Sequence, residues 1–203
     1  MKTDQPSQNS YWVRTGRFAA GEYPGARDSA QAARKIEGLL DAGIDHFIDL
    51  TEIGELVPYD KIADRTASSL GLKIEWERHP IPDLSGSRTR EQMRGILDAI
   101  DDALSDGKTV YVHCWGGVGR TGTVVGCWLV RHGHLGEEAL QEIEERWQHK
   151  AGHGFISKRH DVSGEHGNAG RELCLQAVRR GQAPGSAYPI YQGPPLPARR
   201  WSA

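Results

Sequence analysis

The chain has 203 residues, of which 37% are hydrophobic and 26% are charged, with a formal net charge of −2. This length predicts one compact domain, with two small domains as the alternative, and the small net charge excludes a broad attraction to nucleic acid or anionic membranes. No segment is apolar enough to cross a bilayer or to act as a secretory signal, which predicts a cytoplasmic protein without membrane contact. Three cysteines are too few for a disulfide framework.

Helices and strands alternate along most of the chain. Helices are predicted where apolar residues recur every three or four positions, and strands where they alternate or form short runs. In chain order the predicted elements are a helix over 28–42, a strand over 46–50, a helix over 59–70, a strand over 72–76, a helix over 89–105, a strand over 109–113 and helices over 120–132, 137–148 and 169–180. This alternation predicts an α/β fold with a central, mostly parallel sheet.

The remaining segments are predicted to be loops and tails. Residues 1–10 are polar and are expected to be a disordered tail, and residues 183–203 form a Pro-rich tail. The domain between them is therefore expected to span residues 11–182. Two prolines and a glycine make residues 80–86 a loop, and a stretch rich in glycine and histidine, residues 151–168, links the last two helices.

A glycine-rich turn between the strand over 109–113 and the next helix has Cys114 and Arg120 at its two ends. The residues between them are Trp115, Gly116, Gly117, Val118 and Gly119. Glycines let several backbone N–H groups point into one concavity, and the helix N-terminus adds partial positive charge, so the turn is typical of an anion-binding cradle. These surroundings stabilise a thiolate, and an arginine fork can hold two phosphate oxygens. We predict that Cys114 attacks phosphorus and that Arg120 and the turn bind phosphate, while Thr121 helps the sulfur to leave.

Other readings of this turn fit less well. The stretch from Gly117 to Gly122 matches G-x-G-x-x-G, but a dinucleotide site needs a second strand ending in an acid about 20 residues on, where a helix is predicted. A Walker A motif fails because Cys114 and Arg120 stand where glycine and lysine belong. A buried structural cysteine beside a tight turn is the remaining alternative. The nine histidines show no metal-ligand spacing, so we predict neither a metal nor a cofactor.

The motif His113-Cys114, five residues, then Arg120-Thr121 resembles the signature of the cysteine-dependent protein phosphatases, especially the bacterial dual-specificity and protein-tyrosine phosphatase-like branch. The similarity extends from about Gly16 to Arg180. It implies a single domain with a central sheet flanked by helices on both faces, and hydrolysis of phosphomonoesters through a phosphocysteine without a metal. In this family the matching histidine orders the loop, which implies a supporting role for His113; a core histidine with satisfied hydrogen bonds is the alternative.

The leaving group of such a reaction needs a proton, so a carboxylic acid is expected on a loop near the cradle. Asp83 lies on the loop over 80–86 and resembles the aspartate loop of the family in position and local sequence. We predict that Asp83 protonates the leaving group and later activates water; an aspartate that only caps a turn is the alternative. Residues 50–59, after the first predicted strand, are expected to form one wall of the substrate pocket.

The predicted function is hydrolysis of phosphotyrosine, with phosphoserine and phosphothreonine as further substrates, in phosphoprotein partners. One alternative is a phosphatase of phosphoinositides, nucleic-acid 5′-phosphates or small metabolites, which is disfavoured because the turn carries no lysine for additional phosphates. Another is a catalytically idle phosphate-binding module, which is disfavoured because both a nucleophile and an acid are present. Cys127 and Cys174 are expected to pack within helices.

Overall fold

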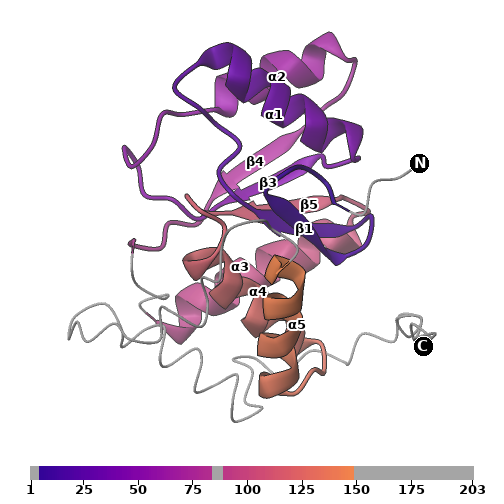
Figure 1. Ribbon diagram of the computed structural model, residues 1–203, viewed down its shortest axis with the longest axis vertical. Coiled ribbons are helices and arrows are strands. Elements are labelled where there is room, and N and C mark those ends of the chain that lie inside the picture. Colours follow the sequence, from indigo (N-terminus) through magenta and orange to yellow (C-terminus); the bar gives the residue numbers. More distant parts are fainter. Residues whose placement is uncertain (1–4, 84–88, 149–203) are drawn as a thin grey trace.

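A five-stranded sheet in the order β1-β2-β5-β3-β4 forms the centre of the computed structural model, which describes residues 5–83 and 89–148 (Figure 1). The strands are β1 (Ser10–Arg14), β2 (Phe18–Gly21), β3 (His46–Asp49), β4 (Glu75–Arg78) and β5 (Val110–His113). The pairs β2–β5, β5–β3 and β3–β4 are parallel, and β1 runs antiparallel to β2. The predicted α/β class with a mostly parallel sheet is confirmed.

Helices cover both faces of the sheet and enclose two hydrophobic clusters. They are α1 (Ser29–Asp41), α2 (Asp60–Ser69), α3 (Arg90–Ser105), α4 (Gly119–Arg131) and α5 (Gly136–Gln148). Helices α1 and α2 lie on one face, and α3, α4 and α5 lie on the other (Figure 1). Successive strand residues point to opposite faces, so Phe47 and Tyr111 pack toward α1 and α2, whereas Ile48 and Val112 pack toward the other helices. The central strands β3 and β5 are therefore buried on both sides.

Helix caps explain where the predicted elements begin and end. Asp28 caps α1 by accepting a hydrogen bond from the backbone N–H of Ala30 at 2.7 Å. At the end of α2, Gly71 has a φ of +71°, and the N–H of Leu72 bonds back to the carbonyl of Ala67 at 2.9 Å. Leu72 therefore belongs to the helix cap. The strand predicted over 72–76 was wrong at its start, because β4 begins only at Glu75.

Strands β1 and β2 were not predicted, although they complete one side of the sheet. They are only five and four residues long, and β2 reads Phe-Ala-Ala-Gly, which lacks the β-branched residues typical of strands. β2 pairs with β5 and β1 pairs with β2, and Ser10, expected at the end of a tail, is fully buried in β1. The predicted segments 151–168, 169–180 and 183–203 lie outside the described residues.

Candidate active site

The turn from Cys114 to Arg120 lies at the carboxyl end of β5, between the ends of β2 and β3. Ligands of open α/β sheets bind in this position, beyond the carboxyl ends of the strands. Gly117 lets the turn approach β2 closely. Its φ is +71°, and a Cβ added there would stand 2.3 Å from the carbonyl carbon of Gly21. Only glycine fits this position, which fixes the path of the turn.

The turn combines a buried thiol with the start of a helix that has no side-chain cap. Cys114 is 3% exposed, whereas Trp115, Gly116 and Gly119 are exposed to solvent. Val118 is the N-cap residue of α4 and makes no side-chain hydrogen bond to the first amides of the helix. Helix amides without a capping acceptor, together with the positive end of the helix dipole, favour a bound anion. The local geometry therefore suits a phosphate held beside the thiol.

Arg120 lies in the first turn of α4, and its guanidinium joins three segments of the chain. Its Nη1 and Nη2 donate to Oε2 and Oε1 of Glu55 at 2.7 and 2.6 Å, which forms a bidentate pair. Nη1 also donates to the carbonyl of Ile81 at 3.1 Å, and Nη2 lies 3.1 Å from Oδ1 of Asp83. The structure thus brings Asp83 to the arginine of the turn, and its side chain remains 49% exposed. An exposed carboxyl group at this place can reach a substrate.

The sequence interpretation missed Glu55 as a partner of Arg120. Residues 50–59 were expected to form a pocket wall, but nothing in the sequence distinguishes Glu55 from the neighbouring Glu52. Partial burial raises the pKa of Glu55, yet the hydrogen bonds and the positive charge of Arg120 outweigh this effect, so its pKa lies below the ordinary value. Glu55 is therefore a carboxylate that holds the guanidinium in place.

His113, at the end of β5, belongs to a buried hydrogen-bond network. Trp76 Nε1 donates to the hydroxyl of Tyr59 at 2.9 Å, and that hydroxyl lies 2.7 Å from His113 Nε2. Burial lowers the pKa of His113 to about 4, so the ring is neutral near pH 7 and its Nε2 can accept a hydrogen bond from the tyrosine hydroxyl. His113 Nδ1 lies 3.9 Å from Asp49, whose other oxygen accepts two hydrogen bonds from Arg78. This network fixes the residue that precedes Cys114.

The hydroxyl of Thr121 is buried on α4, and its Oγ1 has no hydrogen-bond partner among the described residues. A buried hydroxyl of this kind is available to a ligand or to a sulfur atom nearby. Cys127 is fully buried on the same helix, and no disulfide joins it to Cys114. This agrees with packing as the role of Cys127.

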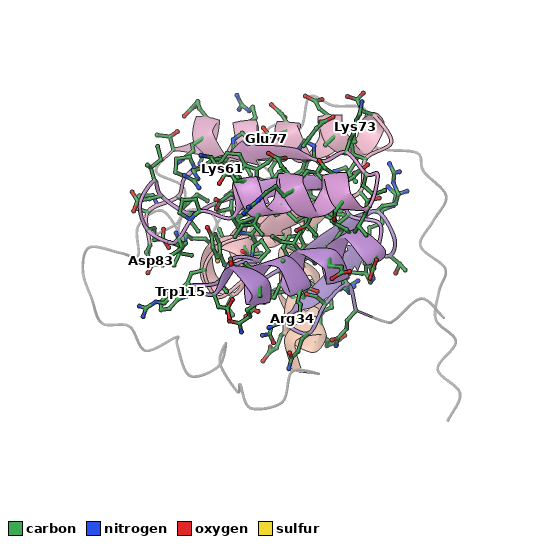
Figure 2. All side chains as sticks on the ribbon, turned by 90° about the horizontal axis from the view of Figure 1, so that it is seen from above. Arg34, Lys61, Lys73, Glu77, Asp83 and Trp115 are labelled. Carbon is green, nitrogen blue, oxygen red and sulfur yellow. The ribbon has the colours of Figure 1, made fainter. Side chains whose placement is uncertain are left out.

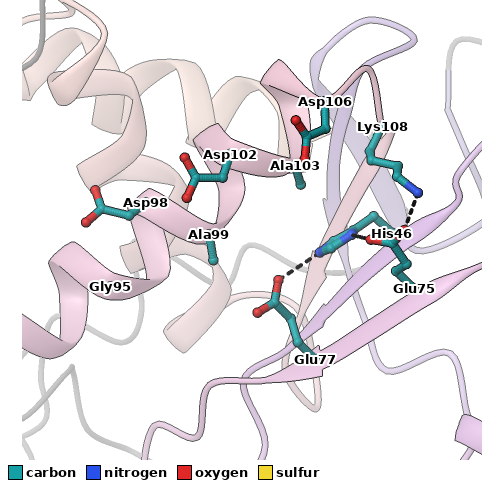
Figure 3. Close-up of a pocket in the computed structure, with 10 residues that line it drawn as sticks. All are labelled: His46, Glu75, Glu77, Gly95, Asp98, Ala99, Asp102, Ala103, Asp106 and Lys108. Atoms are coloured by element: carbon teal, nitrogen blue, oxygen red, sulfur yellow. Dashed lines mark hydrogen bonds and ion pairs between the residues drawn. The ribbon is translucent and has the colours of Figure 1, made fainter.

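A hollow of about 370 Å³ lies at the opposite end of the sheet, beside the amino ends of β3 and β4 and along α3 (Figure 3). Half of its ten lining residues are acidic: His46, Glu75, Glu77, Gly95, Asp98, Ala99, Asp102, Ala103, Asp106 and Lys108. Lys108 is paired with Glu75, and His46 with Glu77 at 2.8 Å. The remaining carboxylates repel phosphate, so this hollow is not the candidate active site.

Within residues 5–83 and 89–148, no group of three or more His, Cys, Asp or Glu side chains is placed to hold a metal ion. In the same part of the chain, none of the helices has the length and apolar character that a membrane span requires.

Comparisons with known proteins point to one group of enzymes. The family described as "Polymorphic toxin system, DSP-PTPase phosphatase" matches residues 22–134, more than half of the chain. "Putative tyrosine phosphatase 067L" of Invertebrate iridescent virus 3 is 33% identical over 100 residues, which are 47% of this chain and 38% of the viral protein. The matched region thus spans about two fifths of that relative's length.

Solved phosphatase structures share the fold. Tk-PTP in its active form has a TM-score of 0.60 and 24% identity, over 85% of this chain and 97% of its own. TpbA of P. aeruginosa has a TM-score of 0.59 and 16% identity, over 90% and 95% of the two chains. PTPMT1, solved in complex with PI(5)P, has a TM-score of 0.57 and 17% identity, over 84% and 94%.

Proposed function

The chain belongs to the DSP-PTPase phosphatases of polymorphic toxin systems, and we propose that it removes phosphate from phosphotyrosine in proteins, with phosphoserine and phosphothreonine as further substrates. The observation that carries the proposal is the turn from Cys114 to Arg120, which joins a buried thiol, an uncapped helix start and a guanidinium. The viral relative named as a tyrosine phosphatase supports the choice of substrate. The turn also carries no lysine to bind additional phosphates.

In the first step, the thiolate of Cys114 attacks phosphorus in line with the ester oxygen. The S–P bond forms as the P–O ester bond breaks, and the proton of the Asp83 carboxyl group moves to the departing oxygen. The amides of the turn and Arg120 hold the other three phosphate oxygens, whose charge persists through the transition state. To bind two phosphate oxygens at once, Arg120 has to give up its contact with Asp83 and donate to phosphate instead. The loss of this contact leaves the Asp83 carboxyl group free to face the leaving group.

In the second step, water hydrolyses the phosphocysteine. The Asp83 carboxylate takes a proton from the water as its oxygen attacks phosphorus, and the S–P bond breaks. The electron pair returns to the sulfur of Cys114, where the hydroxyl of Thr121 donates a hydrogen bond to the departing thiolate. Inorganic phosphate then leaves, and Asp83 is again protonated for the next turnover. His113 stays neutral and acts through the position of the turn.

A panel of phosphorylated substrates tests the proposed function. We expect a kcat/KM for phosphotyrosine peptides at least about tenfold above that for phosphoserine or phosphothreonine peptides of the same sequence. Phosphoinositide vesicles and a 5′-phosphorylated oligonucleotide, assayed by phosphate release, are expected to give still lower values. A higher kcat/KM for either polyanionic substrate would overturn the protein-phosphatase proposal while leaving the phosphatase family intact.

Replacement of Glu55 tests whether its carboxylate positions Arg120. In Glu55→Gln one guanidinium N–H group would face an amide N–H, so a charge-assisted hydrogen bond is lost. We expect kcat/KM to fall about tenfold and the inhibition constant of vanadate, a phosphate-shaped oxyanion, to rise by a similar factor. The melting temperature reports any general loss of stability. The exposed Glu37 on α1 serves as the control, because Glu37→Gln is expected to change neither constant. Tighter vanadate binding by Glu55→Gln would instead show that Glu55 competes with phosphate.

A further inference from the structure

Exposed apolar side chains lie on the turn beside Cys114 and on the loop that carries Glu55. Trp115, next to Cys114, is 63% exposed, and on the facing loop Ile53 is 86% and Val57 is 51% exposed. Its backbone is held in place, because the carbonyl of Trp115 accepts the N–H of Tyr23 at 2.9 Å. Its indole makes no hydrogen bond or ring contact with the described residues. A large apolar side chain with a fixed backbone and an unoccupied face is typical of a contact surface.

Two connections bind the loop of Ile53 and Val57 to the turn that carries Trp115. The hydroxyl of Tyr23 donates to the carbonyl of Val57 at 2.9 Å, while the backbone N–H of the same tyrosine bonds to Trp115. The bidentate pair between Glu55 and Arg120 closes the loop against the other end of the turn. These contacts hold the backbone of the loop beside the turn where a phosphate would bind.

The position of Asp83 indicates the direction in which the rest of a bound substrate extends from the phosphate. Figure 2 shows Asp83 and Trp115 at the same edge of the molecule, both pointing outward from the ribbon. A phosphate held by the turn places its ester oxygen near Asp83, so the next group of the substrate lies beside Trp115. In a phosphotyrosine that group is an aromatic ring, whereas in a phosphoserine it is one methylene group and then the peptide backbone.

We propose that Trp115 packs against the aromatic ring of the substrate, with Ile53 on the facing loop, and so makes the enzyme select aryl over alkyl phosphates. This inference rests on the proposed function and names the residue that determines its specificity. Arg120 and the turn amides recognise the phosphate group of either substrate equally well. The selectivity is therefore expected to come from the apolar contact, which an aryl phosphate makes and an alkyl phosphate does not.

The test compares two substrates that differ only in the phosphorylated residue. We expect Trp115→Ala to lower kcat/KM for a phosphotyrosine peptide roughly five- to tenfold, mainly through KM, and to change the value for the matched phosphoserine peptide less than twofold. Trp115→Phe should restore most of the loss, because it keeps an aromatic face. The inhibition constant of vanadate, which has no ring, should stay unchanged in both variants.

Leu135 provides the matched control, since it is also 63% exposed but lies beyond the far end of α4. Leu135→Ala is expected to leave both kcat/KM values unchanged. An equal loss on the two peptides, a parallel change in vanadate binding, or no loss at all in Trp115→Ala would overturn the role of Trp115. If the wild-type enzyme releases phosphate from neither peptide, the proposed function itself fails, and the two failures are therefore distinguishable.

Discussion

Cys114→Ser is expected to lower kcat for p-nitrophenyl phosphate by roughly 10⁴-fold or more, the scale on which loss of a nucleophile affects covalent catalysis. A serine hydroxyl in the same position holds its proton far more tightly than a thiol. The positive end of α4 and Arg120 therefore cannot stabilise enough of the deprotonated serine to replace the thiolate. Because both side chains have nearly the same shape, phosphate binding should persist, and vanadate should still protect the variant against heat. Turnover at the wild-type rate would rule out Cys114 as the nucleophile.

Cys127 is the appropriate control for this variant, as the second buried thiol on the described part of the chain. Cys127→Ala removes a packed sulfur atom, so it is expected to lower stability by about 1–2 kcal/mol and to leave kcat within a factor of two. An acid quench during turnover adds a second readout. Mass spectrometry should find one phosphoryl group on the peptide that contains Cys114 in the wild type and none in Cys114→Ser.

The sequence predicts the turn well because its chemistry is local. Cys114, the glycines and Arg120 lie within seven consecutive residues, and a strand and a helix of strong hydrophobic pattern flank them. The structure adds that Gly117 is required by the close approach of Gly21, a contact between segments almost a hundred residues apart. The local sequence pattern can indicate a turn, but it does not show which distant segment of the backbone will pack against that turn.

The parts that sequence reasoning missed depend on contacts between distant segments. β2 becomes a strand because β5 offers an edge for pairing, although its own residues carry little strand preference, and β1 then pairs with β2. Glu55 and Arg120 are 65 residues apart, and only the folded loop selects Glu55 rather than Glu52 as the partner. The tyrosine and tryptophan that orient His113 come from the N-cap of α2 and from β4, where they resemble ordinary apolar residues. Such networks follow from the packing of elements.

Asp83→Asn is expected to lower kcat by about 10²–10⁴-fold, because an amide cannot deliver the proton that the leaving oxygen requires. The loss should be largest for phenyl phosphate and phosphotyrosine peptides, whose leaving groups are basic. It should be smaller for p-nitrophenyl phosphate, whose leaving group departs more readily without a proton. This dependence separates the proposed acid from a purely structural role, which would lower all three rates equally. The exposed Asp64 on α2 gives the control, since Asp64→Asn should retain the wild-type kcat.

The split between kcat and KM decides whether Asp83 is the proton donor or only a partner of Arg120. If Asp83 delivers the proton, Asp83→Asn should lower kcat and change KM little, because phosphate binding is left intact. If Asp83 served only to contact the guanidinium, the variant would instead show a raised KM and a nearly normal kcat. A carboxyl group 3.1 Å from the arginine that binds phosphate can serve either purpose, and a loss confined to kcat is the result that the proton-transfer role requires.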